Sequence, residues 1–157
     1  MNKKIEMKGI LMIMLLVLVM GITNAQSKYK GLPSTTWPKL YDISYETRND
    51  QFGEYEAPIF SDAARSIEGK EVYIEGYIMP FEGIETNKFI LSSLPINACY
   101  FCGNGGPESV IQIITKKPIR YTEKPIELKG VLKLNPDNPE EMIYSLIDTE
   151  FSGVLKF

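Results

Sequence analysis

The sequence predicts an all-β protein: a small, five-stranded, OB-like barrel with one short helix. Five segments between residues 71 and 147 either alternate in hydrophobicity or are rich in β-branched residues, and turn residues separate them. No long helical periodicity accompanies them. Closure into a barrel removes the exposed strand edges that so few strands would otherwise present. An open antiparallel sandwich is the alternative architecture.

The N-terminal part of the domain is predicted from local signals. Residues 26–36 have the composition of a turn or linker and are expected to form a flexible lead-in. The aromatic residues of 37–41 are expected to pack onto the domain, and Ile43 to Arg48 has a weak strand pattern. Residues 61–67 are typical of a short helix, with Ser61 as the N-cap and Gly69 just past the end.

The five strands follow Gly69. They are predicted at residues 71–79, 88–94, 110–115, 126–134 and 142–147. The alternation is cleanest in 126–134, where Ile, Leu and Gly at every second position predict a half-buried strand. Gly76 and Gly130 stand in the middle of two strands, where a barrel needs sharp bends or bulges.

Residues 1–25 have the features of a secretory signal peptide. Three lysines precede an apolar stretch of 11 residues at 10–20, and Thr23 and Ala25 place small residues at −3 and −1 of a cleavage site. A stretch of this length is shorter than the ~20 residues of a spanning helix. Cleavage leaves residues 26–157, in which 37–157 form a single domain, and predicts an exported protein, periplasmic or secreted, without stable membrane insertion.

The composition excludes several classes of function. Loss of three Lys and one Glu with the leader changes the formal net charge from −3 to −5. An acidic chain argues against nucleic acid as a partner, since nucleic acids select for basic patches. The chain contains no histidine. This excludes His-based acid–base catalysis and every His-ligated metal site.

The one distinctive motif is Cys99-Tyr100-Phe101-Cys102. In an exported chain this spacing is compatible with a static disulfide, a metal half-site or a redox pair. The disulfide would close a very short loop, so its stabilisation should lie well below the ~3 kcal/mol of a 15-residue loop. The redox interpretation lacks a following helix N-terminus, because a glycine-rich run comes directly after the pair.

The metal interpretation needs further donors, because a closed zinc site has four ligands. Glu108 is the first candidate, with Asn104, Glu82 and Glu85 as others. A second copy of the chain is an equally simple source of the missing ligands, because it would bring two more thiolates. Zinc or another thiophilic metal suits such a site.

The residues around the cysteines define a candidate loop and rim. Gly103-Asn104-Gly105-Gly106 allows the backbone to turn tightly and to approach a bound ion closely. Tyr77, Tyr100 and Phe101 are candidates for an aromatic platform, although packing explains them equally well.

From about Trp37 to Phe151 the sequence resembles an uncharacterised bacterial envelope family, a domain of unknown function with secreted and lipoprotein members. The most specific matching pieces are Gly76-Tyr77-Ile78-Met79-Pro80 and Asn97-Ala98-Cys99. Relatives commonly continue Ala-Cys with Ile-His and a run of prolines, whereas this chain has Phe101 at the His position and Cys102 after it. The resemblance implies an envelope location and, loosely, an association with transport or metal homeostasis.

These observations together predict a non-enzymatic, exported envelope protein. Its expected activity is binding through the loop of Cys99 and Cys102, either of a metal ion or of a partner such as an envelope transporter component or a second copy of the chain. A thiol–disulfide redox protein and an adaptor module with a static Cys99–Cys102 disulfide are the alternatives.

Overall fold

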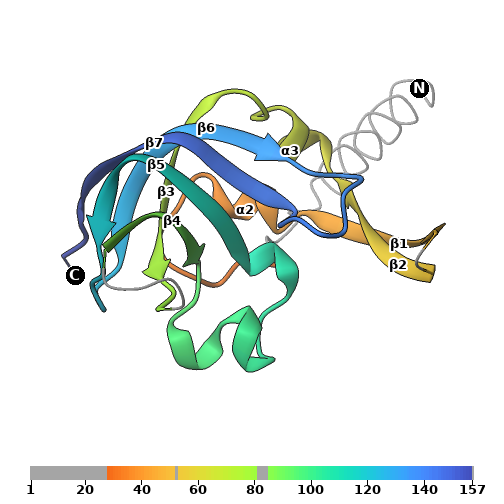
Figure 1. Cartoon of the computed structure of the whole chain (residues 1–157), viewed down its shortest axis with the longest axis horizontal. Helices are drawn as coiled ribbons and strands as arrows, with labels where there is room; N and C mark the ends of the chain where they lie inside the picture. The colour runs from red at the N-terminus through yellow and green to blue at the C-terminus, as the bar shows by residue number, and fades with distance from the viewer. Residues whose placement is uncertain (1–27, 52, 81–84, 157) are drawn as a thin grey trace, which may run out of the picture.

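A computed structural model describes residues 28–51, 53–80 and 85–156 (Figure 1). The predicted leader, residues 1–25, lies outside this range, as do Glu82 and the side chain of Glu85. The β-strands are β1 Ile43–Asp50, β2 Gly53–Phe60, β3 Glu71–Ile78, β4 Glu85–Ser92, β5 Val110–Arg120, β6 Ile126–Leu134 and β7 Tyr144–Val154. The helices are α2 Trp37–Leu40, α3 Asp62–Arg65 and three 3₁₀ turns, η1 Ile96–Ala98, η2 Tyr100–Cys102 and η3 Pro107–Ser109.

Five strands form a closed barrel in the order β3-β4-β5-β7-β6, and pairing of β3 with β6 completes the ring. The β5–β7 pair is parallel and the other neighbours are antiparallel. The predicted all-β, OB-like barrel is therefore confirmed, and the open sandwich does not occur. Each of the five predicted strands has a counterpart, with ends that differ by up to seven residues.

The barrel interior follows the alternation of the strands. In β6, Ile126, Leu128 and Leu132 are fully buried, while Glu127, Lys129 and Val131 are half-buried. Gly130 faces inward in the same row, where an added Cβ would lie 2.7 Å from Thr149 Oγ1. A register shift between Lys129 and Val131 marks this bend in the β6–β7 pair. The mid-strand glycine is therefore required by the close approach of β7.

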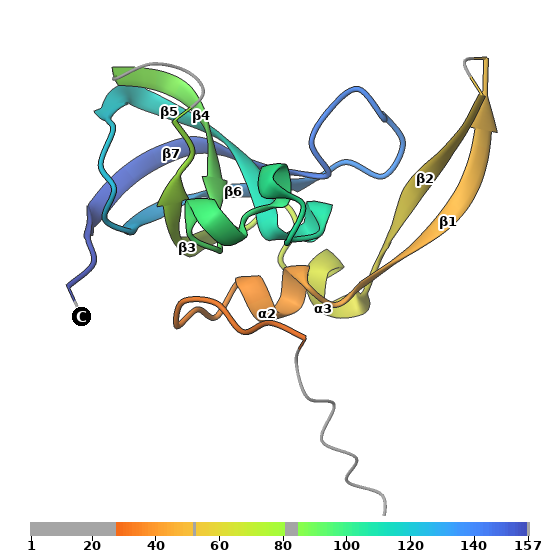
Figure 2. The ribbon, with the colours of Figure 1, turned by 90° about the horizontal axis from the view of Figure 1, so that it is seen from below.

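Two short helices cover the underside of the barrel (Figure 2). In α2, Trp37 is fully buried, and its Nε1 donates a hydrogen bond to the Glu75 carbonyl at 2.6 Å. In α3, the Ser61 side chain accepts from the Ala64 amide, which confirms Ser61 as the N-cap. Tyr144 fixes α2 from the barrel side, because its hydroxyl donates to the Leu40 carbonyl at 2.6 Å.

The lead-in segment makes specific contacts where it is described. Ser34 Oγ accepts hydrogen bonds from the Thr36 and Trp37 amides, and Thr36 Oγ1 donates to the Tyr73 carbonyl. Tyr29 packs edge-on against Tyr41 at 5.0 Å between ring centroids. The described part of the lead-in, residues 28–36, therefore contacts Tyr41 at the end of α2 and Tyr73 in β3.

A two-stranded hairpin extends away from the barrel (Figure 2). It comprises β1, predicted as a weak strand, and β2, which the sequence pattern did not predict. All eight residues of β1 pair with β2, from Ile43 opposite Phe60 to Asp50 opposite Gly53. The base of the hairpin is anchored by buried Ala57, Pro58 and Phe60, whereas its far end is exposed. In the part of the chain that the structure describes, the strands thus form a barrel and one projecting hairpin.

Among the described residues, the structure contains no helix that is both long and apolar enough to cross a membrane.

Candidate functional site

The two cysteines lie in a long connection between β4 and β5, which we call the Cys loop (residues 93–109). Two hydrogen bonds close the base of this loop. The Ser93 amide donates to the Ser109 carbonyl at 2.9 Å, and the Ser93 hydroxyl donates to the same carbonyl at 3.1 Å. Within it, η1, η2 and η3 follow one another. Gly103 ends η2 with φ +78°, a left-handed conformation that favours glycine. The predicted glycine-rich segment is therefore part of a folded loop.

Cys99 and Cys102 are brought together, with their sulfur atoms 3.7 Å apart and no disulfide between them. Cys99 is fully buried and Cys102 is exposed. The Cys102 thiol donates to the Ile96 carbonyl at 2.9 Å. Its hydrogen bond with Cys99 raises the pKa of Cys102 above the ordinary thiol value. A raised pKa lowers the thiolate fraction, which is the opposite of what a thiol nucleophile needs.

Glu108 stands in η3, but its carboxylate is used elsewhere. Glu108 Oε2 accepts a hydrogen bond from the Tyr45 hydroxyl at 3.0 Å. Asn104 is also engaged, because its amide donates to the Asn97 carbonyl at 3.2 Å. Within the described part of the chain, no group of three or more Cys, Asp or Glu side chains could hold a metal ion. A closed zinc site needs four ligands, and the two thiols offer only two donors.

Three large apolar side chains of the Cys loop face solvent. Ile96, Tyr100 and Phe101 are 49%, 40% and 44% exposed. The Tyr100 and Phe101 rings contact each other edge-on, with centroids 5.3 Å apart. Tyr77, predicted to share a platform with them, instead lines a separate hollow with Leu32, Pro33 and Leu94. We call Ile96, Tyr100 and Phe101 the apolar knob.

A groove of about 930 Å³ lies beside the Cys loop, between the hairpin and the outer face of the barrel. Tyr100 and Pro107 line it from the Cys loop, and Tyr45 and Tyr55 line it from the hairpin. The connection between β6 and β7, residues 135–143, forms another side. Sequence reasoning missed Tyr45 and Tyr55, because the signal for the hairpin was a single weak strand pattern in 43–48.

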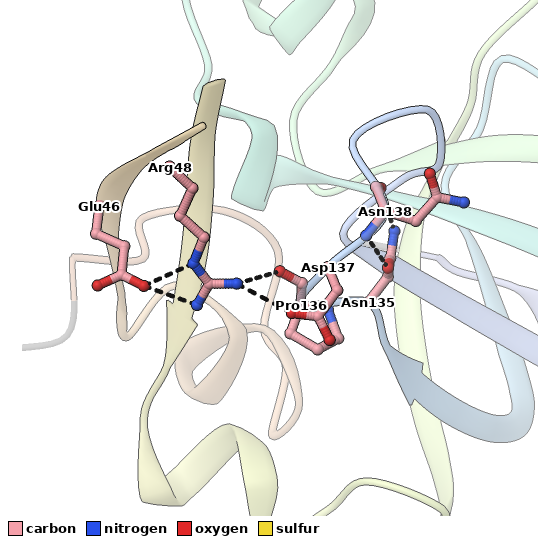
Figure 3. A network of polar contacts seen from close by, with 6 residues as sticks. All are labelled: Glu46, Arg48, Asn135, Pro136, Asp137 and Asn138. Atoms are coloured by element: carbon pink, nitrogen blue, oxygen red, sulfur yellow. Dashed lines mark hydrogen bonds and ion pairs between the residues drawn. The ribbon is translucent and has the colours of Figure 1, made fainter. Parts of the chain in front are cut away.

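Polar contacts join the hairpin to the barrel around this groove. Arg48 donates to Asp137 Oδ1 at 3.0 Å and to the Pro136 carbonyl at 3.4 Å, and it also pairs with Glu46 (Figure 3). The side chain of Asn135 braces the 135–143 connection, donating to the Asn138 carbonyl and accepting from the Asn138 amide. Arg48 therefore links the hairpin to the 135–143 connection, which has its own internal hydrogen bonds.

Comparison of this chain with models of protein families, with curated proteins and with solved structures finds no match. The resemblance to an envelope family remains a prediction.

Proposed function

We propose that this protein is a non-enzymatic, exported envelope protein that binds a polypeptide partner through the Cys loop. The observation that carries the proposal is the apolar knob: three large, exposed apolar side chains within residues 96–101, on a loop closed at its base by hydrogen bonds. Concentrated apolar exposure of this kind marks protein–protein interaction sites, in which aromatic residues are enriched. The leader-like segment supports export, and an envelope transporter component or a second copy of the chain suits the knob.

The local geometry supports a rigid binding element rather than a catalytic one. Tyr100 and Phe101 lie between the two cysteines, and the Cys102 amide donates to the Cys99 carbonyl at 3.1 Å. Cys99 is anchored in the interior, so the knob is held at its base. A preorganised loop loses little conformational entropy on binding, and the affinity benefits accordingly.

Site-specific photo-crosslinking in the producing cell tests this function. A photoreactive phenylalanine analogue replaces Phe101 in one variant and Tyr73, 48% exposed on β3, in a control variant. We expect a discrete crosslinked product from position 101, identified by mass spectrometry, and none of the same mass from position 73. Products of a second copy would appear at twice the chain mass. Absence of any product at 101, or an identical pattern at both positions, would refute the proposal.

A second candidate function, binding of zinc or another thiophilic metal, is favoured by the sulfur separation. Two thiolates at ~2.3 Å from one tetrahedral ion lie about 3.8 Å apart, close to the 3.7 Å between Cys99 and Cys102. The remaining two ligands would come from a second copy or from the partner. Native mass spectrometry with added Zn²⁺ tests it: one ion per two chains, lost in Cys102→Ser, supports the site, and metal-free monomers oppose it.

A further inference from the structure

The barrel forms the floor of the groove beside the Cys loop, with three isoleucines among polar side chains (Lys88, Gln112, Lys133 and Ser145). Ile90 of β4, Ile114 of β5 and Ile147 of β7 line it. These strands are neighbours in the barrel, and Ile114 is 39% exposed. Tyrosine rings stand around this floor, Tyr45 and Tyr55 on the hairpin and Tyr100 on the Cys loop. Isoleucines bounded by aromatic rings are suited to apolar side chains of an extended ligand.

Two side-chain contacts tether the walls of the groove to each other. The hydrogen bond from Tyr45 to Glu108 ties the hairpin to the Cys loop. The ion pair of Arg48 with Asp137 ties the hairpin to the 135–143 connection. Because both walls are tethered, a ligand can bind without first ordering the receptor.

The way in which the floor is built restricts how a peptide can bind. The five barrel strands form a closed ring, so the floor offers side chains rather than a free strand edge. A peptide therefore cannot be held there by extending a β-ladder of the barrel. A polyproline II segment needs no such ladder, because its carbonyls are free to accept hydrogen bonds and its backbone is already extended. Tyr55 and Tyr100 line the groove. Their hydroxyls make no hydrogen bond among the described residues and can donate to such carbonyls.

The charges of the groove differ between its two sides. Glu56 on the hairpin and Glu140 and Glu141 in the 135–143 connection line it, and none has an ion-pair partner among the described side chains. Lys88 and Lys133 line it from barrel strands. The adjacent carboxylates at 140 and 141 favour a basic residue at that end of the ligand.

We propose that this groove binds a proline-containing segment of the partner in the polyproline II conformation, with a basic residue placed near Glu140 and Glu141. The inference rests on the proposed function and names the part of the partner that would be recognised. Tyr100 belongs to both the knob and the groove, whereas Phe101 does not line the groove. The two proposals can therefore be tested separately.

Fluorescence polarisation with a synthetic labelled peptide, Arg-Pro-Leu-Pro-Pro-Leu-Pro, tests the inference on the full exported chain. Two control peptides replace all prolines by alanine or the arginine by glutamate. We expect saturable binding of the first peptide and at least about tenfold weaker binding of each control, because alanine removes the preformed conformation and glutamate reverses the charge. No saturable binding at millimolar peptide, or equal binding of the alanine peptide, would overturn the inference.

Protein variants locate the binding. Tyr100→Ala and Tyr55→Ala should each weaken binding of the arginine peptide about tenfold, and the control Tyr73→Ala should change it less than twofold. The double variant Glu140→Lys/Glu141→Lys should prefer the glutamate peptide, which would also show that the variant is folded. Unchanged preference in that variant, or unchanged affinity in Tyr100→Ala and Tyr55→Ala, would refute the assignment. If crosslinking through Phe101 succeeds while the peptide fails, the groove proposal falls and the proposed function stands.

Discussion

Tyr45 donates a hydrogen bond of 3.0 Å to the carboxylate of Glu108, and this contact joins residues 63 positions apart in the chain. Tyr45 belongs to the projecting hairpin and Glu108 to the end of the Cys loop. The sequence offered Glu108 as a ligand for a metal beside Cys99 and Cys102. Its position instead makes it a tether between the two elements that border the groove.

Removal of this tether should loosen the hairpin without unfolding the barrel. Tyr45→Phe loses a hydrogen bond to a charged group, for which about 1.5–3 kcal/mol is typical, and partial exposure places the expected loss at the lower end. Hydrogen–deuterium exchange should show reduced amide protection in residues 43–51, in residues 53–60, and at Glu108 and Ser109. The control Thr47→Val removes an exposed contact between Thr47 and Glu56 within the hairpin, 2.8 Å long, and should leave Glu108 and Ser109 unchanged. Equal protection in Tyr45→Phe and the unmodified protein would contradict the tether.

The barrel strands could be predicted from the sequence because the alternation of apolar and polar residues that marks a strand is a local pattern. Alternation in 126–134 places Ile126, Leu128 and Leu132 on one face, and the structure buries those residues. The strand order was not predictable in the same way, since the parallel pairing of β5 with β7 depends on contacts between residues far apart in the chain. The sequence reports which faces are apolar, and long-range packing decides which strands meet.

The hairpin and its groove could not be predicted for a related reason. The residues of β2 alternate poorly, because their burial depends on contact with the barrel: Ala57 and Pro58 are adjacent and both buried. The Cys pair was found from spacing alone, but spacing could not show that Glu108 turns toward Tyr45. A residue type indicates which chemistry is available, and only the tertiary contacts indicate which partner uses it.

The mid-strand glycines provide a sharp test of barrel closure. A Cβ at Gly76 would lie 2.6 Å from the Ser92 carbonyl oxygen, and one at Gly130 would lie 2.9 Å from the Ile147 carbonyl oxygen. Because backbone atoms cannot move aside easily, Gly76→Ala and Gly130→Ala should each reduce the free energy of unfolding by about 1–3 kcal/mol. Gly153→Ala is the matched control, with no atom within 4 Å of the added Cβ. Urea denaturation measures all three, and a control as destabilised as the other two would argue against this explanation.

The two thiols should differ in reactivity. Cys102 is exposed and Cys99 is fully buried, so an alkylating reagent should modify Cys102 first. Since the pKa of Cys102 is raised by its hydrogen bond with Cys99, the rate should keep increasing above pH 8.5, where an ordinary thiol is half ionised. Peptide mapping by mass spectrometry after timed labelling with iodoacetamide checks both points. Preferential labelling of Cys99 would contradict the described geometry.

Oxidation should close the pair into a disulfide at small energetic gain. An oxidised dithiol compound can exchange with the two thiols, leaving a Cys99–Cys102 bond and the reduced reagent. The sulfurs already lie 3.7 Å apart, so the loop needs little rearrangement. The ring is short, and we expect stabilisation well below the ~3 kcal/mol of a 15-residue loop. Urea denaturation of the oxidised and reduced protein measures this stabilisation. A gain above ~3 kcal/mol would contradict the short-ring explanation.

Alkaline pH should destabilise the protein through its buried tyrosines. Burial raises the pKa of Tyr29, Tyr45 and Tyr144 well above the ordinary tyrosine value, and it also raises that of Tyr41. In the unfolded chain these hydroxyls ionise near pH 10. The folded state therefore binds more protons than the unfolded state above that pH, so stability is retained below about pH 10 and lost as pH rises. Each such group contributes a slope of at most about 1.4 kcal/mol per pH unit.

Urea denaturation at pH 8, 10 and 11 should show the decline in stability. The variant Tyr144→Phe, although less stable at pH 8, should lose stability less steeply as pH rises. A slope unchanged by Tyr144→Phe would show that this hydroxyl does not titrate with unfolding.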